Sequence, residues 1–222
     1  IEALAWASNL DWGFEKHPPL SAIFPEIFYQ IFGRQDWAYY LLSQIFIVFS
    51  FIVIFKLAKE FLKNEIHALL SVLLLEGIYF YNFTTPEFNV NVCQIPFWTL
   101  TVYYFWQCLK TDKIKNWILI GLFAALGVLS KYLFIYLLFG IVLFFIFNFK
   151  KNKKFNYKCL IPIIVFLLVL TPHFIWLIDN EFKTVFYGLN RTSVADSNFL
   201  SHLLHPLKLI LKQIVILIPF FV

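Results

Sequence analysis

Two short stretches of the sequence hold residues suited to acid–base chemistry and to binding an anion. In LDWGFEKHPPLSAIF, residues 10–24, Lys16 and His17 come directly before two prolines, which stiffen the backbone and remove two amide donors. A stiff loop with two basic residues suits anion binding, although the same pair could cap an interfacial helix beside lipid headgroups. In FTTPEFNVNV, residues 83–92, Glu87 offers a carboxylate after a proline, whereas a plain turn would explain the other polar residues.

Two further ionisable residues stand in apolar surroundings. Glu76, in LLLEGIYFYNF, is expected about seven residues inside a membrane span, or roughly 10 Å deep. A carboxylate at that depth normally faces a polar cavity or a partner, but it could also be a protonated or hydrogen-bonded packing residue. Lys131, in VLSKYLF, is expected in a short turn between two spans, where it either snorkels to the surface or binds a carboxylate or phosphate.

The sequence gives little sign of a metal site. His202 and His205 have the i, i+3 spacing of a metal-binding pair, but no third ligand follows at a useful spacing. There is no Gly-rich phosphate loop, nucleophile elbow or HExxH motif. We therefore predict no metal-binding residues and no certain cofactor, with a divalent cation as an open alternative.

The elements that must position these residues are membrane helices. The 222-residue chain is 61% hydrophobic and 14% charged, whereas an average soluble domain is about 45–50% apolar and about 25% charged. Lipid solvates apolar helix faces that water would not. The net charge of +5 lies in short blocks between apolar segments, which favours membrane orientation over nucleic-acid binding. The predicted class is an all-α, polytopic transmembrane helical bundle.

About six to seven membrane spans are predicted. They lie at residues 37–57, 66–83, 90–109, 117–132, 133–149 and 158–178, with a seventh that begins near Pro206. Residues 20–32 are too short to span and contain Pro25, so we expect a helix that lies at the interface and is interrupted there. We expect residues 1–222 to form one domain, an internal fragment that lacks its first span and its C-terminal part.

The loops between these spans alternate in charge. Three of them hold 11 of the 18 basic residues, against only Glu60, Glu65 and Asp112. The other loops are rich in acids. The positive-inside rule places the Lys-rich loops in the cytoplasm, so that the acid-rich loops and any active site face outward.

Several stretches resemble, in order and spacing, the bacterial glycosyltransferase family 39 proteins. This family includes protein O-mannosyltransferases and the aminoarabinose transferases that modify lipid A. The resemblance covers nearly the whole chain and rests on EALAW, LDWGFEKHPPLSAIF, LLLEGIYFYNFTTPEFNVNV, GVLSKY and TPHFIWLIDN. It implies a GT-C helical bundle in the bacterial inner membrane, a first outer loop over a periplasmic or external active site, and a lipid-linked sugar donor, usually a polyprenyl monophosphate sugar.

The resemblance also implies roles for two carboxylates. Glu2 matches the Glu of the family's first acidic motif, while Ile1 stands where the adjacent Asp would be, and the alternative Asp would lie upstream. Glu87 corresponds to the acidic residue that follows Thr-Pro in the family. Glu2 or Glu87 would then act as the base for the acceptor hydroxyl.

The cationic residues would stabilise the departing phosphate in a single displacement that inverts the anomeric carbon. The candidates are Lys16, His17, Lys131 and Arg191. Lys131 matches the family's Ser-Lys-Tyr, and Lys16 or His17 corresponds to a basic position before its proline pair. The expected partners are the donor, a lipid A, envelope glycan or protein acceptor, and membrane lipids, with no nucleic acid.

Two other functions remain open from the sequence. A transporter or flippase of lipid-linked sugars would place Glu76 and Lys131 on a substrate path. A catalytically inactive member of the family is the other alternative, because Ile1 replaces an acidic residue.

Overall fold

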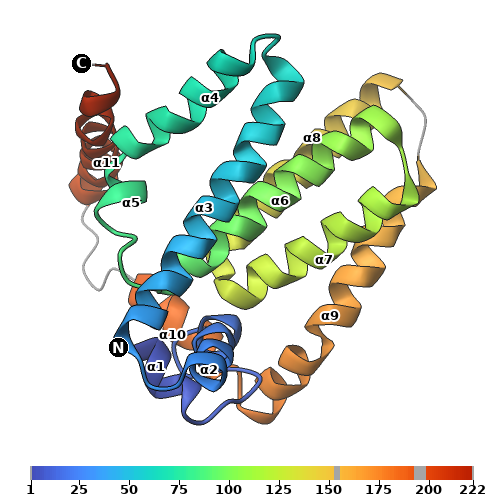
Figure 1. The fold of residues 1–222 in the computed structure, drawn as a ribbon. Helices are drawn as coiled ribbons and strands as arrows, with labels where there is room; N and C mark the ends of the chain where they lie inside the picture. Colours follow the sequence, from blue (N-terminus) through green and yellow to red (C-terminus); the bar gives the residue numbers. More distant parts are fainter. Residues whose placement is uncertain (1, 153–155, 193–198, 222) are drawn as a thin grey trace.

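The structure is a computed structural model that describes residues 2–152, 156–192 and 199–221 (Figure 1). The side chains of residues 2, 79, 148–155, 192–203 and 219–222 lie outside the described part of the chain. Every regular element in the described part of the chain is helical, which confirms the all-α prediction.

Six helices are long. They are α3 (Asp36–Phe61), α6 (Val90–Thr111), α7 (Ile114–Ser130), α8 (Ile135–Asn152), α9 (Leu160–Asp179) and α11 (Phe199–Phe221). The shorter helices are α1 (Glu2–Ala7), α2 (Leu20–Phe32), α4 (Glu65–Leu73), α5 (Tyr79–Asn82) and α10 (Lys183–Thr192). The 3₁₀ turns are η1 (Leu74–Gly77), η2 (Tyr132–Phe134) and η3 (Tyr157–Cys159).

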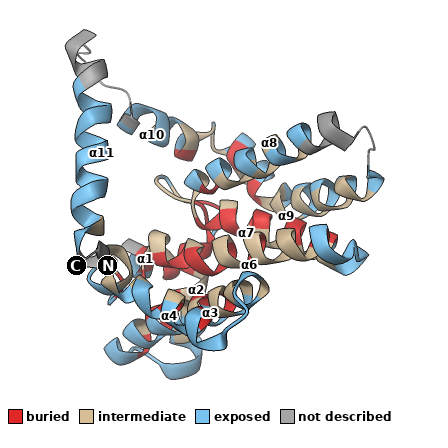
Figure 2. Ribbon diagram, turned by 90° about the horizontal axis from the view of Figure 1, so that it is seen from above, coloured by how far each residue is buried: buried red, intermediate tan, exposed pale blue. Residues whose placement is uncertain are grey.

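The buried core forms where α3 packs against α6, α6 against α7, and α7 against α9. In Figure 2 the buried residues gather along α6 and α7, whereas α11 is exposed along its described length. Small residues let the core helices approach closely. At Gly121 of α7, a Cβ atom would come within 2.5 Å of the carbonyl oxygen of Pro162 on α9.

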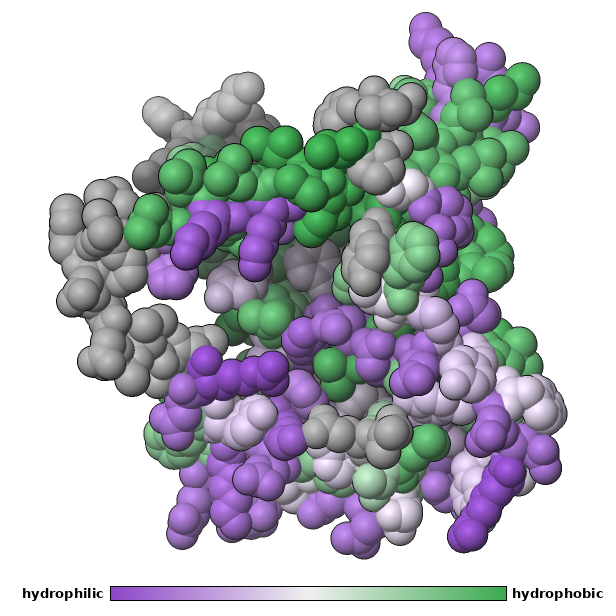
Figure 3. Space-filling model, turned by 90° about the vertical axis from the view of Figure 1, so that its left-hand side faces the viewer, coloured by the Kyte–Doolittle hydropathy of each residue, from purple (hydrophilic) through white to green (hydrophobic). Residues whose placement is uncertain are grey.

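Two helices, α3 and the segment Tyr157–Asp179 that contains α9, are long and apolar enough to cross a membrane. Only 28% and 11% of their most apolar windows are buried, so they are not the core helices of a water-soluble fold. Figure 3 shows hydrophobic residues over the upper part of one face and hydrophilic residues at the lower end, near α1, α2 and α10. An exposed apolar surface of this kind fits contact with lipid.

The span predicted over residues 66–83 is not one continuous helix. Helix α4 ends at Leu73, a 3₁₀ turn follows to Gly77, and Ile78 is extended before α5 begins. Gly77 has a low helix propensity, and Asn82 donates its side-chain amide to the carbonyl of Glu76 at 3.3 Å. Glu76 therefore lies at a break and is exposed, rather than inside a straight span.

Two helix boundaries also differ from the sequence prediction. Helix α2 runs through Pro25 without interruption, because a proline removes one intrahelical hydrogen bond but need not end a helix. Helix α11 begins at Phe199, before Pro206. Hydropathy marks the apolar part of that helix and not its first polar turns.

The Lys-rich loops meet at one end of the bundle. Each acidic residue in them is paired: Lys59 with Glu65, Lys110 with Glu60 and Lys158 with Asp112. The second pair joins α6 to α3, and the third joins the α6–α7 turn to η3.

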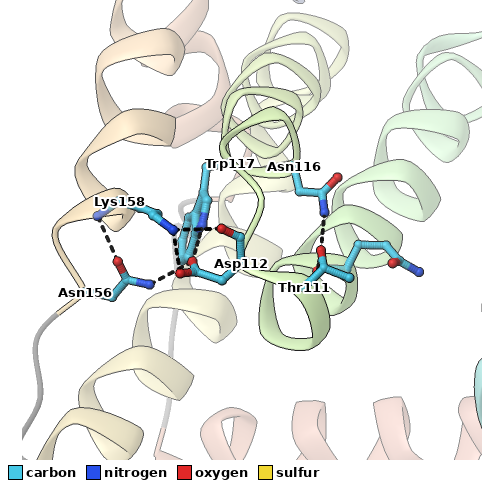
Figure 4. Close-up of polar contacts among 7 residues, drawn as sticks. Thr111, Asp112, Asn116, Trp117, Asn156 and Lys158 are labelled. Carbon is cyan, nitrogen blue, oxygen red and sulfur yellow. Dashed lines mark hydrogen bonds and ion pairs between the residues drawn. The ribbon is translucent and has the colours of Figure 1, made fainter.

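Asp112 is the centre of a polar cluster at this end (Figure 4). It occupies a left-handed backbone conformation at the end of α6, with φ 48°. Its carboxylate accepts hydrogen bonds from Lys158 Nζ at 2.6 Å, Trp117 Nε1 at 2.9 Å and Asn156 Nδ2 at 2.9 Å. The hydrogen bonds from Lys158, Trp117 and Asn156 lower the pKa of Asp112 to about 2.

The variant Asp112→Asn should lower the free energy of unfolding by no more than about 1 kcal/mol, because solvent screens a half-exposed ion pair. Asn tolerates the left-handed conformation, so the change isolates the charge. The carboxylate's contribution is complete above its unfolded-state pKa of about 3.9 and is lost as the pH falls toward 2. Thermal unfolding in detergent at pH 7 and pH 3.5 should show the difference between wild type and variant shrinking in acid. An equal difference at both values would contradict this account.

Candidate functional site

The opposite end of the bundle gathers the acid-rich loops. Helices α1, α2 and α10 lie there with the first turns of α3 (Figure 1). The segment between α1 and α2, residues 8–19, is called the outer loop below. Its carbonyl and carboxylate groups are bound by residues of α9 and α10, far away in the sequence.

A cavity of about 610 Å³ opens between α1, α2, the start of α3 and the loop before α6. Its wall combines carboxylates and an arginine with aromatic rings, a surface suited to a polar ring-shaped ligand such as a sugar. The ionisable and aromatic residues of the wall include Glu26, Tyr29, Arg34, Asp36, Tyr39, Tyr40 and Glu87.

Glu87 reaches this cavity from a loop that is fixed on both sides. The carbonyl of Thr85 accepts a hydrogen bond from Ser43 Oγ at 2.6 Å, and the carbonyl of Phe88 accepts one from Tyr39 Oη. Thr85 and Phe88 are buried, whereas Glu87 between them is exposed. The α3 helix therefore holds the loop and leaves the carboxylate at the cavity wall.

Lys131 lies at the end of α7 and is half-buried. Its Nζ donates to Asn91 Oδ1, in the first turn of α6. Burial and then the positive charge of Arg191, on α10, lower the pKa of Lys131.

The start of α6 binds both the backbone of Glu87 and the side chain of Lys131. Asn89 caps this helix by accepting hydrogen bonds from the backbone amides of Asn91 and Val92, and it donates to the carbonyl of Glu87 at 3.0 Å. Asn91 in turn binds Lys131. The segment that carries Glu87 and the ammonium group of Lys131 are thus both bound at the start of α6.

A protein-family profile described as dolichyl-phosphate-mannose-protein mannosyltransferase matches residues 16–176. The chain belongs to this family. It is a membrane glycosyltransferase of the GT-C type. Comparison with curated proteins and with solved structures gave no match.

The structure brings together only part of the site that the sequence predicts for this family member. Glu87 lines the cavity, and the side chain of Glu2 lies outside the described residues, although its helix α1 supplies Leu4 and Ala7 to the same wall. The ring of His17 contacts Trp6 of α1, with centroids 5.6 Å apart. The outer loop therefore lies next to the cavity through α1.

The cationic candidates and Glu76 do not line this cavity. Its described wall includes none of Lys16, His17, Lys131 and Arg191. Glu76 lies at the helix break in η1, which packs against α11. Among the described side chains, no group of three or more His, Cys, Asp or Glu could hold a metal ion.

Sequence reasoning missed the residues that fix the outer loop in this mannosyltransferase-family chain. Trp176 Nε1 donates to Asp11 Oδ2 at 2.6 Å, and the Trp176 ring packs so closely on Gly13 that a Cβ there would lie 2.3 Å from it. His173 binds the carbonyl of Trp12. The spacing of His173 and Trp176 at the end of a span was the available signal, but their partners are more than 160 residues away in the chain.

Proposed function

We propose that this chain transfers a sugar from a polyprenyl monophosphate donor to an extracytoplasmic acceptor, a lipid or a protein. The observation that carries the proposal is the exposed Glu87 at the cavity wall, with its backbone and Lys131 both bound at the start of α6. The family match supports sugar transfer, and the cavity beside Glu87 has room for a sugar.

The chemistry is a single displacement at the anomeric carbon. Glu87 accepts the proton of the acceptor hydroxyl while that oxygen attacks the anomeric carbon. The bond from the anomeric carbon to the phosphate oxygen breaks, and the phosphate leaves with the electron pair, which inverts the configuration. Lys131 and Arg191, with Lys16 and His17 of the outer loop, stabilise the charge that gathers on the phosphate. An acceptor that is itself a phosphate would need no strong base.

The proposed orientation follows from the charges of the two ends. The Lys-rich end lies in the cytoplasm of a bacterial inner membrane, and the end with the cavity faces the periplasm or cell exterior. Residues 1–222 belong to one glycosyltransferase domain in this proposal.

A transporter of lipid-linked sugars is the second candidate, and one observation favours it. The helix break at Glu76 interrupts a membrane segment, as happens at the substrate sites of secondary transporters. A transporter would move the donor across the bilayer without forming a new glycosidic bond.

The test is an assay of the full-length protein in liposomes with a polyprenyl monophosphate sugar and a hydroxyl-bearing acceptor, run with and without EDTA. We expect a new glycosidic bond of inverted configuration, detected by mass spectrometry and NMR. Movement of the donor across the bilayer with no product would support the transporter instead. A divalent-cation requirement would show as loss of product in EDTA.

A further inference from the structure

One hydrogen-bond bridge links the outer loop to the hydroxyl of Tyr132. His173, on α9, is only 3% exposed. Its Nδ1 lies at hydrogen-bond distance from the carbonyl of Trp12, and its Nε2 lies 2.8 Å from Tyr132 Oη. Thr184, on α10, donates to the carbonyl of Phe14 and so holds the same loop from a second helix. The carbonyl of Trp12 is thus linked to the hydroxyl of Tyr132 through the ring of His173.

The protonation of His173 follows from its partners. A carbonyl oxygen can only accept a hydrogen bond, so Nδ1 carries the ring hydrogen and donates it to Trp12. In the neutral ring Nε2 then accepts the hydrogen of Tyr132 Oη. One tautomer gives each buried ring nitrogen a hydrogen-bond partner, and both partners belong to this bridge.

Tyr132 directly follows Lys131, and the turn between them is short and rigid. The carbonyl of Lys131 accepts a hydrogen bond from the amide of Phe134 at 3.1 Å, which closes the 3₁₀ turn. The bridge therefore connects the backbone that carries Lys131 to the outer loop that carries Lys16 and His17. Without this bridge, Lys131 and the outer-loop residues Lys16 and His17 would be connected only through the packing of the other helices.

We propose that His173 is a positioning residue that sets Lys131 at a fixed distance from the cations of the outer loop, so that both sides bind the same donor phosphate. His173 is buried and does not touch the substrate. This inference rests on the proposed function, because it assumes a phosphate-bearing donor. The proposed role of His173 differs from simple anchoring of the loop, because removing His173 also affects Lys131 through Tyr132.

Trp176 provides the matched control. It belongs to the same helix and holds the same loop through Asp11, but this hydrogen bond does not involve Tyr132. The variant Trp176→Phe keeps an aromatic ring at this position and removes the indole donor that binds Asp11. It should loosen the outer loop without moving Lys131.

The experiment compares His173→Phe, Tyr132→Phe, the double variant and Trp176→Phe in the full-length protein. His173→Phe and Tyr132→Phe should each raise the KM for the polyprenyl monophosphate sugar about fivefold, as expected for one lost hydrogen bond. The kcat should change less, because the donor carries its phosphate charge before reaction begins. The double variant should be no worse than the more affected single variant, since both remove the same bridge.

Hydrogen exchange of the peptide that contains the outer loop gives a readout that does not depend on turnover. It should be faster in His173→Phe and Trp176→Phe alike, whereas KM should rise more in His173→Phe, because that variant also separates Tyr132 and the backbone of Lys131 from the loop. An unchanged KM in His173→Phe and Tyr132→Phe would overturn the inference. So would additive effects in the double variant, or a rise in KM for Trp176→Phe equal to that for His173→Phe.

The failure of the proposed function is distinguishable from failure of the bridge. If the wild type transfers no sugar, the same variants are compared for binding of decaprenyl monophosphate. A larger loss of binding in His173→Phe and Tyr132→Phe than in Trp176→Phe would support the positioning role alone. Absence of binding to the wild type would overturn both.

Discussion

Replacing Glu87 by Gln should lower the kcat of sugar transfer by about 10²–10⁴-fold, the usual contribution of a general base. Gln keeps the size and polarity of the side chain but cannot accept the proton of the acceptor hydroxyl. The loop should keep its shape, because its hydrogen bonds to α3 use the carbonyls of Thr85 and Phe88 and not the carboxylate. Steady-state kinetics with a polyprenyl monophosphate sugar would measure the change.

The matched control is Glu181→Gln, which removes an exposed carboxylate from the turn between α9 and α10. This variant should transfer sugar at the wild-type rate. A normal kcat in Glu87→Gln would remove Glu87 from the mechanism and leave Glu2 as the candidate base. A similar loss in both variants would indicate a general effect of charge instead.

Replacing Lys131 by Met should lower kcat/KM for the donor by about 10²-fold, the effect expected when a fixed cation is removed from developing negative charge. Met fills a similar volume without the charge, so packing at the end of α7 should change little. Because burial and Arg191 lower the pKa of Lys131, the wild type should also lose donor affinity on the alkaline side, below the pH at which an exposed lysine titrates. This pH dependence should be absent in the Met variant.

Lys183→Met is the control for Lys131, because Lys183 is exposed at the same end of the bundle. Its kcat/KM should equal that of the wild type. If both variants lost activity equally, a diffuse electrostatic attraction of the donor would explain the result better than a defined phosphate site.

Hydropathy was sufficient to predict the helices whose sequence is apolar along their whole length. The structure places α3 and α9 within a few residues of the predicted spans. The break at Glu76 was not predictable in this way, because Leu, Ile and Phe continue on both sides of Gly77. What ends the helix there is local geometry, the 3₁₀ turn and the extended Ile78, to which mean hydropathy is insensitive.

The candidate site was predictable only as separate residues. Glu87 and Lys131 were recognisable because an ionisable side chain next to an apolar span is costly unless it has a role. The hydrogen bonds that link them through Asn89 and Asn91 were not recognisable from the sequence, because Lys131 and Asn91 are 40 residues apart. The contact of His173 was not predictable either, because nothing in the sequence places Trp12 beside it.

The most direct test of the central claim is the sidedness of the two ends of the bundle. Glu87→Cys and Lys115→Cys, each in a chain with Cys159 replaced by Ser, would be labelled in intact and opened cells with a maleimide that does not cross membranes. We expect Glu87→Cys to react in intact cells and Lys115→Cys to react only after the membrane is opened. Reaction of Glu87→Cys only after opening would contradict the account, because the cavity would then face the cytoplasm.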